Sequence, residues 1–286
     1  MTLASLSAAL VALVVVSAPT AATGESGHGP VFGMTTPTNA TGAWALDFGV
    51  MGRSGEGRVG LMTRVMATYG VTEDLQISAS APLVFASAPF AAARGTAMMP
   101  ANGDLEAIGA WRFHRRGTAV GTRVESTAYA GIIVPGPQQP AGVVGGLKRA
   151  PGLYVAGATG LASRSHYVWA GVGYTRFAER SGDRRADVVS YSAVWGYRPP
   201  ALRTEYPHWD WRLFVELTGE RASDLRRADM VQDGTAGHQI FVGPTALGIL
   251  RNYAIEGGVQ FPVYRKLGAA LRREAIRYAV NLSYFF

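Results

Sequence analysis

The chain has no cysteine and almost no lysine, and it carries little charge for its length. With 0 Cys in 286 residues, disulfides and thiolate metal sites are excluded, which suits an exported protein that needs neither. Lysine occurs only at Lys148 and Lys266. Charged residues make up 16% of the chain, whereas soluble domains average about 25%.

Long apolar runs are also missing. Hydrophobic residues make up 48% of the chain. After the N-terminal region, however, no stretch reaches the roughly 20 apolar residues that a transmembrane helix needs. A chain that is apolar in total but never in a run is either an all-core soluble protein or a set of alternating membrane strands.

The N-terminus resembles a secretory signal. A short apolar run at 8–16 is followed by small residues up to Ala22, as in the h-region and cleavage region of a signal peptide. No Lys or Arg precedes the run, which departs from the usual pattern, and a buried core helix is the alternative. We predict a signal peptide at 1–22, a loose periplasmic segment or plug at 23–42, and a β-barrel at 43–286.

The last residues alternate strictly between large apolar and small or polar side chains. One face carries Tyr278, Val280, Leu282, Tyr284 and Phe286, and the other carries Ala279, Asn281 and Ser283. Outer-membrane barrels end in this way, because the last strand closes the barrel and faces lipid with alternate residues. We therefore predict that this strand contacts outer-membrane lipid and is the strand that the barrel-assembly machinery engages.

Similar alternation recurs along the whole chain. We predict roughly twelve strands, an even number as in single-chain bacterial barrels, near 43–51, 58–69, 74–84, 103–114, 120–134, 152–162, 166–177, 186–198, 208–220, 238–250, 252–264 and 275–286. The connections at 70–73, 115–117, 163–165 and 251–252 are short, and those at 85–102, 135–151, 178–185, 221–237 and 265–274 are long. With both termini in the periplasm, the long set lies outside the cell. The connection at 199–207 is longer than its class predicts.

These patterns predict an all-β protein, an antiparallel transmembrane β-barrel of about twelve strands in the bacterial outer membrane. The competing fold is a soluble, periplasmic lipocalin-like binding protein, whose strands also alternate. Such a barrel would carry Lys and Glu freely on its polar face. Here the two lysines fall in connections, and the polar faces carry Arg and carboxylates among Gly, Ser and Thr, which favours the membrane barrel.

The polar faces supply the candidate functional residues. We expect an inward-facing set that comprises Arg58, Arg64, Arg112, Arg123, Arg176, Arg212, Arg277, Asp104, Glu106, Glu125, Asp210, Glu216, Glu256 and Gln260. The constriction candidates are Arg64, Arg112, Arg123, Glu125, Arg212, Glu216, Glu256 and Gln260, with Arg64, Arg123 and Arg212 facing Glu125, Glu216 and Glu256 across the lumen. Such a ring would sort small solutes. The alternative is a structural barrel whose lumen is closed by the same paired charges.

Other function classes find little support. The chain contains no Gly-x-Ser-x-Gly elbow and no His-Glu-x-x-His motif, so we predict neither catalytic residues nor a cofactor. The five His residues show no metal-ligand spacing. A net charge of +7 could suggest nucleic acid, but the Arg residues are scattered through strand-like segments. We therefore expect a small-molecule solute and no nucleic-acid partner.

Several hairpin motifs resemble a known group of barrels. The stretch at 69–76, which reads Tyr-Gly-Val-Thr-Glu-Asp-Leu-Gln and enters a strand containing Pro82, is similar to the first periplasmic hairpin of that group. Gly243-Pro244 and the stretch at 256–263 resemble its late strands. The group comprises transporter-like outer-membrane barrels associated with meta-cleavage phenol degradation pathways. The resemblance implies a channel for small, aromatic or metal-related solutes, and it transfers no binding residue.

Overall fold

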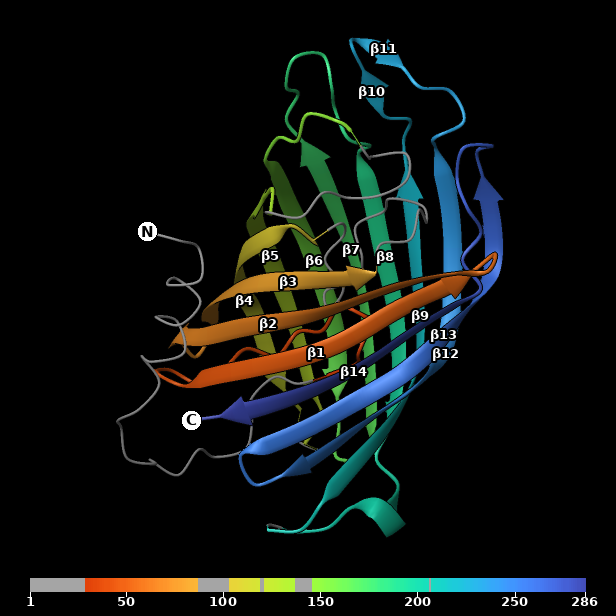
Figure 1. Ribbon diagram of the computed structural model, residues 1–286. Helices are drawn as coiled ribbons and strands as arrows, with labels where there is room; N and C mark the ends of the chain where they lie inside the picture. The colour runs from red at the N-terminus through yellow and green to blue at the C-terminus, as the bar shows by residue number, and fades with distance from the viewer. Residues whose placement is uncertain (1–28, 87–102, 119–120, 137–145, 206) are drawn as a thin grey trace.

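A computed structural model describes residues 29–86, 103–118, 121–136, 146–205 and 207–286, so the predicted signal peptide at 1–22 lies outside the described residues. Twelve antiparallel strands close into a single barrel (Figure 1). Around the ring they follow the order β1-β14-β13-β12-β9-β8-β7-β6-β5-β4-β3-β2. No helix among the described residues is long and apolar enough to cross a membrane.

Each barrel strand overlaps one of the segments predicted from the sequence. The strands are β1 (Trp44–Gly55), β2 (Arg58–Thr72), β3 (Leu75–Ala86), β4 (Leu105–Gly117), β5 (Arg123–Val134), β6 (Gly152–Ala162), β7 (His166–Phe177), β8 (Val188–Tyr197), β9 (Asp210–Ala222), β12 (Gly237–Leu250), β13 (Tyr253–Leu267) and β14 (Ile276–Phe285). The prediction of an all-β, twelve-stranded antiparallel barrel is confirmed.

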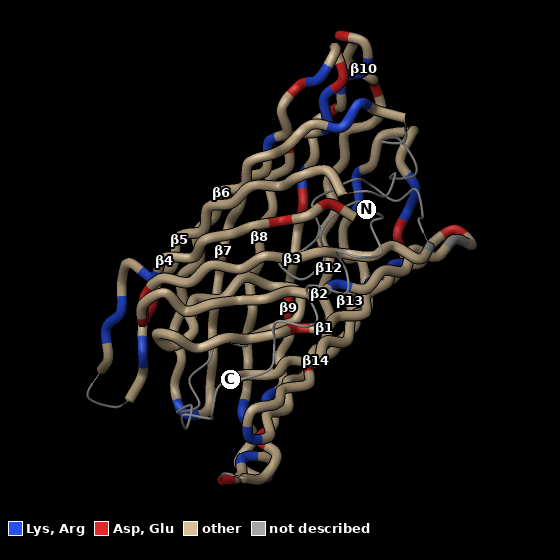
Figure 2. Tube along the Cα trace, turned by 60° about the vertical axis from the view of Figure 1, so that its left-hand side comes forward, with Lys and Arg blue, Asp and Glu red and all other residues tan. Residues whose placement is uncertain are grey.

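The outer wall of the barrel is apolar because successive residues of a strand point to opposite faces. On β14, the side chain of Val280 is 54% exposed, whereas its neighbour Asn281 is 1% exposed and faces the lumen. The same inversion separates Val65 from the buried Arg64 on β2. Figure 2 shows the charged residues gathered mostly towards the two ends of the strands. A soluble lipocalin-like barrel would show polar residues on this outer face instead.

Pairing of β1 with β14 closes the barrel, so neither strand is left with an unpaired edge. The register runs from Ala45 opposite Phe285 to Ser54 opposite Ile276. Beyond it, the backbone N–H of Trp44 donates to the carbonyl oxygen of Phe286 at 2.8 Å. We refer to this β1–β14 pairing as the seam.

The two ends of the barrel differ. At one end of the barrel, which we call the terminal end, β1 begins and β14 ends. This end carries the turns at 73–74, 163–165 and 251–252. The opposite end, the loop end, carries the connections at 87–104, 135–151, 178–187, 223–236 and 268–275. They correspond to the five predicted to be long, with bounds that differ by a few residues. One tight turn also lies at the loop end, where Glu56 and Gly57 adopt positive φ angles of 47° and 70°, as two-residue hairpins require.

A small hairpin at the loop end was not predicted from the sequence. Its strands are β10 (Arg226–Arg227) and β11 (Met230–Val231), and it stands beyond the barrel strands in Figure 1. The Asp183 carboxylate accepts hydrogen bonds from the backbone N–H groups of Lys148, at 2.8 Å, and Ala228, at 2.9 Å. These two bonds hold the pKa of Asp183 below its usual value. The carboxylate thus ties three connections together.

The apolar outer wall generates a first prediction. Val172 lies in the middle of β7 and is 56% exposed, and Val231 lies in the hairpin beyond the barrel and is 52% exposed. Val172→Arg should lower the free energy of unfolding in lipid vesicles by about 2–4 kcal/mol, because it places a charge in the hydrocarbon. Val231→Arg is the matched control and should change that free energy by less than about 0.5 kcal/mol. Equal effects of the two substitutions would contradict a bilayer around β7.

Candidate functional site

Residues 29–39 lie inside the barrel without regular secondary structure. The side chains of Val31 and Phe32 are each 1% exposed and pack against Met51 and Ala279, which face inward from β1 and β14. We refer to residues 29–39 as the N-terminal segment. Because a buried irregular segment carries unpaired backbone groups, its hydrogen-bond partners show what holds it in place.

Glu216 on β9 supplies the main anchor. Its carboxylate is completely buried and accepts hydrogen bonds from the backbone N–H groups of Val31, Phe32 and Gly33, each at 2.7 Å. The hydroxyl of Thr245 on β12 donates a further bond to the same carboxylate. Four donors converge on two oxygens, which fits an ionised carboxylate because a protonated one would lose acceptor capacity.

From Glu216 the segment crosses the lumen to the far wall of the barrel. Near the start of this path, the N–H of Met34 donates to the Ser192 hydroxyl on β8, the neighbour of β9, at 3.0 Å. Farther along, the N–H of Asn39 donates to the Gln76 side-chain carbonyl on β3 at 2.8 Å. β9 and β3 stand fifth and eleventh in the twelve-strand ring, six positions apart, so they face each other across the lumen. The N-terminal segment therefore spans the full width of the barrel.

Between these two anchors the segment contacts the wall formed by β5 and β7. The Thr127 hydroxyl donates to the carbonyl of Thr36 at 2.5 Å, and the Tyr129 hydroxyl donates to the carbonyl of Thr35. The Trp169 indole N–H donates to the Thr36 hydroxyl at 3.2 Å. A cavity of about 150 Å³ remains beside the segment, with Asp47 and Glu256 among its lining residues.

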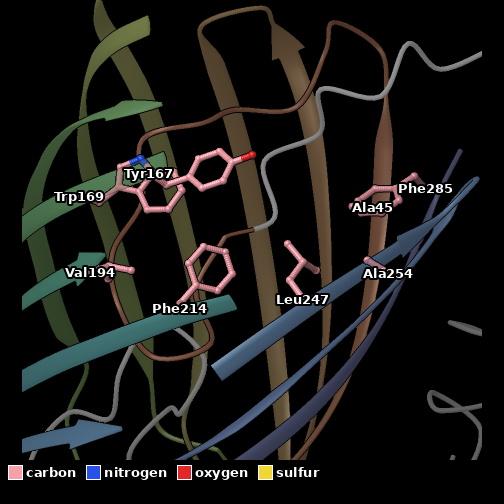
Figure 3. Close-up of a cluster of buried hydrophobic side chains, with 8 residues drawn as sticks. All are labelled: Ala45, Tyr167, Trp169, Val194, Phe214, Leu247, Ala254 and Phe285. Carbon is pink, nitrogen blue, oxygen red and sulfur yellow. The ribbon is translucent and has the colours of Figure 1, made fainter. Parts of the chain in front are cut away.

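One half of the lumen carries a continuous apolar surface towards the terminal end. Figure 3 shows its inward-pointing side chains, which are Ala45, Tyr167, Trp169, Val194, Phe214, Leu247, Ala254 and Phe285. They come from β1, β14, β13, β12, β9, β8 and β7, which are consecutive in the ring. The rings of Tyr167 and Trp169 stack with their centroids 5.5 Å apart. We refer to this surface as the apolar crescent.

The opposite part of the wall carries ion pairs. On β4 and β5, the Arg112 guanidinium lies 3.1 Å from the Glu125 carboxylate and 2.9 Å from that of Asp74. Arg123 lies 3.1 Å from the same Glu125. Arg112, Arg123 and Glu125, three constriction candidates, therefore form one cluster that faces the apolar crescent. Glu125 also accepts a hydrogen bond from the Thr36 hydroxyl at 3.3 Å.

The remaining constriction candidates lie in other places. Gln260 accepts a hydrogen bond from the Thr218 hydroxyl at 2.8 Å. Arg64 is buried and lies close enough to Glu256 to interact with it electrostatically. Arg212 lies 3.6 Å from Asp210 at the terminal end of β9.

Three expectations about these residues are wrong. Arg123 and Arg212 were expected to face carboxylates across the lumen, but each pairs on its own strand, Arg123 with Glu125 and Arg212 with Asp210. Arg176 was expected to point inward, yet it is exposed on the outer face, because its neighbours Thr175 and Phe177 are the buried residues at that end of β7. The side chain of Arg58 lies outside the described part of the structure.

Sequence reasoning also missed an ion-pair network near the loop end. Arg277 lies 2.5 Å from Glu220 and 2.6 Å from Glu274, and its guanidinium stacks 3.7 Å from the ring centre of Phe241. Glu220 could have been found, because it continues the inward alternation of Glu216 and Thr218. Glu274 precedes its strand, so no alternation marks it.

Comparison with known proteins identifies the type of fold. No family model matches the chain, and no curated protein matches it significantly. An outer membrane channel from Pseudomonas putida F1 superposes with a TM-score of 0.62 at 13% identity, covering 92% of this chain and 100% of that one. The fold is that of a bacterial outer-membrane barrel. The NanC porin superposes with a TM-score of 0.52 at 10% identity, covering 84% and 98%. At such identities the likeness establishes the fold alone.

The anchor at Glu216 generates a second prediction. Glu216→Gln keeps the shape of the side chain but removes the charge from the acceptor, and a hydrogen bond to a charged group contributes about 1.5–3 kcal/mol. Because the chain has no cysteine, Met34→Cys gives a unique thiol on the segment. With Glu216→Gln, this thiol should react with a soluble maleimide about tenfold faster or more.

The control for this experiment is Glu179→Gln, which removes a charge from an exposed connection. It should leave the labelling rate of the Met34→Cys thiol unchanged. Equal rates in the Glu216→Gln variant and its parent would show that the carboxylate does not hold the N-terminal segment.

Proposed function

We propose that this chain forms a channel for small solutes in the bacterial outer membrane, without catalytic activity. The N-terminal segment closes the channel in the conformation described above. The observation that carries the proposal is the course of the segment from Glu216 on β9 to Gln76 on β3, across the full lumen. The segment is held by a few hydrogen bonds and by the packing of Val31 and Phe32, so it can leave without opening the wall, whereas a wall strand cannot. The channel and the porin with the same fold support the proposal.

The lining of the lumen favours an amphipathic aromatic solute. The apolar crescent offers the stacked rings of Tyr167 and Trp169, which suit an aromatic ring. The facing wall offers Arg112 and Arg123, which can exchange part of their pairing with Glu125 for the carboxylate of a solute. A small aromatic acid would contact both walls at once. The resemblance of the hairpin motifs to barrels associated with phenol degradation points to the same class of solute.

The orientation follows from the usual sidedness of such barrels. Residues 1–22 would direct export, and β14 would engage the assembly machinery through the outward face that carries Val280, Leu282 and Tyr284. The terminal end would then face the periplasm and the loop end the cell exterior. In this orientation the N-terminal segment enters the lumen from the periplasmic side.

A second candidate function is that of a structural barrel that never opens. The buried ion pairs favour it, since Arg112 with Glu125 and Arg277 with Glu220 fill the wall near both ends of the lumen. Removing one partner of such a pair typically costs about 3–5 kcal/mol where water has no access and far less where the pair is hydrated. Conductance separates the two functions directly.

A third prediction therefore concerns current across a planar bilayer. The parent protein should show brief, infrequent openings, because the anchors of the N-terminal segment must break first. A variant without residues 29–39 should show long openings of higher conductance. Glu216→Gln should lie between the two, because it weakens one anchor and leaves the others in place.

Two measurements give this experiment its controls. Glu179→Gln should conduct like the parent, and all variants should keep the heat-modifiable mobility of a folded barrel. A parent that never conducts, at any voltage and with any small aromatic acid, would contradict the channel proposal even if the shortened variant conducts. The structural barrel would then be the better description.

A further inference from the structure

A row of basic side chains crosses three adjacent strands on the outer wall near the loop end. The strand register places Arg221 of β9 opposite His238 of β12, and His238 opposite Lys266 of β13. The inward neighbours Glu220 and Gln239 are buried, so the row itself points away from the lumen. Directly opposed residues of antiparallel strands have Cβ atoms about 4.5–5.5 Å apart. The three side chains therefore share one small patch, the basic row.

The basic row is not neutralised by the protein. Among the described residues, no carboxylate forms an ion pair with Arg221 or Lys266 within 4.0 Å. Arg221 and Lys266 lie on either side of β12, so one anion from outside the chain can contact both cations.

Two tyrosines fix the middle of the row. The Tyr191 hydroxyl lies 2.7 Å from the His238 Nε2 atom, and the ring of Tyr264 meets that of His238 edge-on with centroids 5.0 Å apart. Tyr191 reaches His238 by crossing β9 at Gly219, where a Cβ would lie 2.1 Å from the tyrosine ring. Glycine is required there by close approach. The patch is therefore a supported surface.

The tyrosines also indicate the depth of the row in a membrane. Tyr191 and Tyr264 each lie on the barrel side of the row, and Tyr174 on β7 lies level with it, opposite Val189, which is itself opposite Arg221. Tyrosines collect at the level of lipid headgroups, and Arg or Lys side chains just beyond them reach the headgroups themselves. Arg176, exposed two residues beyond Tyr174, adds a cation on the same side.

Among the described residues, this arrangement occupies one sector of the barrel. The outward residues near the loop end of β3, β4, β5 and β6 are apolar and exposed, namely Leu83, Leu105, Val134 and Leu153. General attraction to anionic lipid would not require the cations to gather on one sector. The sector also contains one carboxylate, that of Asp187, which lies opposite Arg176 if the β7–β8 register is continued by one residue. With Arg176, Arg221 and Lys266 positive, the sector keeps a surplus of positive charge.

We propose that the basic row is a binding site for the phosphorylated headgroup of a glycolipid in the outer leaflet. Arg221 binds phosphate oxygens through its planar fork, Lys266 adds a point charge, and His238 donates or accepts according to its tautomer. The tyrosines pack against the sugar and the first part of the acyl chains. The inference rests on the proposed outer-membrane location and is independent of whether the channel opens.

A fourth prediction tests this site with diphosphoryl lipid A as the probe. The purified protein in nonionic detergent is titrated with the lipid, and the bound fraction is measured by native mass spectrometry. The double variant Arg221→Gln/Lys266→Gln should bind at least tenfold more weakly than the parent. Lipid A without its phosphates should bind the parent weakly. Its affinity should be no higher than the affinity of diphosphoryl lipid A for the double variant.

The matched control is Arg226→Gln/Arg227→Gln. It removes the same charge from the exposed hairpin at the same end of the molecule, and it should bind diphosphoryl lipid A like the parent. Heat-modifiable mobility shows that every variant is folded. Equal binding by Arg221→Gln/Lys266→Gln and the parent would overturn the proposal, as would an equal loss in the control.

Two further results separate this inference from others. Competition by inorganic phosphate at millimolar concentration would identify a site for free anions and overturn the assignment to lipid. If the parent conducts no current but the double variant binds lipid A more weakly than the parent does, only the channel proposal is contradicted. If the parent conducts current but the parent and the double variant bind lipid A equally well, only the proposed lipid site is contradicted.

Discussion

The structure depends on one constraint, which is that backbone N–H and C=O groups facing lipid must find partners within the sheet. The seam meets it by pairing β1 with β14 from Ala45 to Ser54, so neither of these end strands leaves an open edge. Closing the sheet with twelve strands leaves a lumen, and the alternation of side chains sends every second residue into it. Apolar residues can stay on the outer wall, but arginines and carboxylates are forced into a narrow interior. The ion pairs and the N-terminal segment both follow from this crowding.

Within that interior, Glu216 differs from three other buried carboxylates. Glu125, Glu220 and Glu274 lie beside arginines, whereas Glu216 is bound by main-chain N–H groups and one hydroxyl. Successive backbone N–H groups that point at one anion form a concave site with partial positive charge. Because the donors belong to the main chain, the side chains of residues 31–33 do not contribute to this grip. Glu216, by contrast, cannot be replaced without loss, because Asp is shorter and Gln is uncharged.

Much of the fold was predictable because strand alternation is local. All twelve barrel strands lie within the predicted segments or within a few residues of them, and the two faces of β14 were assigned correctly. The lumen site was less predictable. Alternation identified Arg112, Arg123 and Glu125 as inward-facing, but the pairing of Arg212 with Asp210 depends on height along the barrel axis, which alternation does not encode. Arg176 was misplaced because the inward face of β7 carries the large rings of Tyr167, Trp169 and Phe177, so polarity does not distinguish its two faces. The partners of Glu216 were missed because backbone N–H groups have no signature in a sequence.

The seam also has a consequence for the order in which the molecule assembles. Trp44 and Phe286 lie at opposite ends of the chain, so the contacts between β1 and β14 close the longest loop of all and form late. The N-terminal segment is joined to the start of β1, so closure of the seam also fixes the point from which the segment enters the lumen. A barrel that closed around an empty lumen would hold Glu216 without its amide donors until the segment moved in from the terminal end. Docking of the segment is therefore a step separate from closure, and the buried Glu216 carboxylate favours its completion.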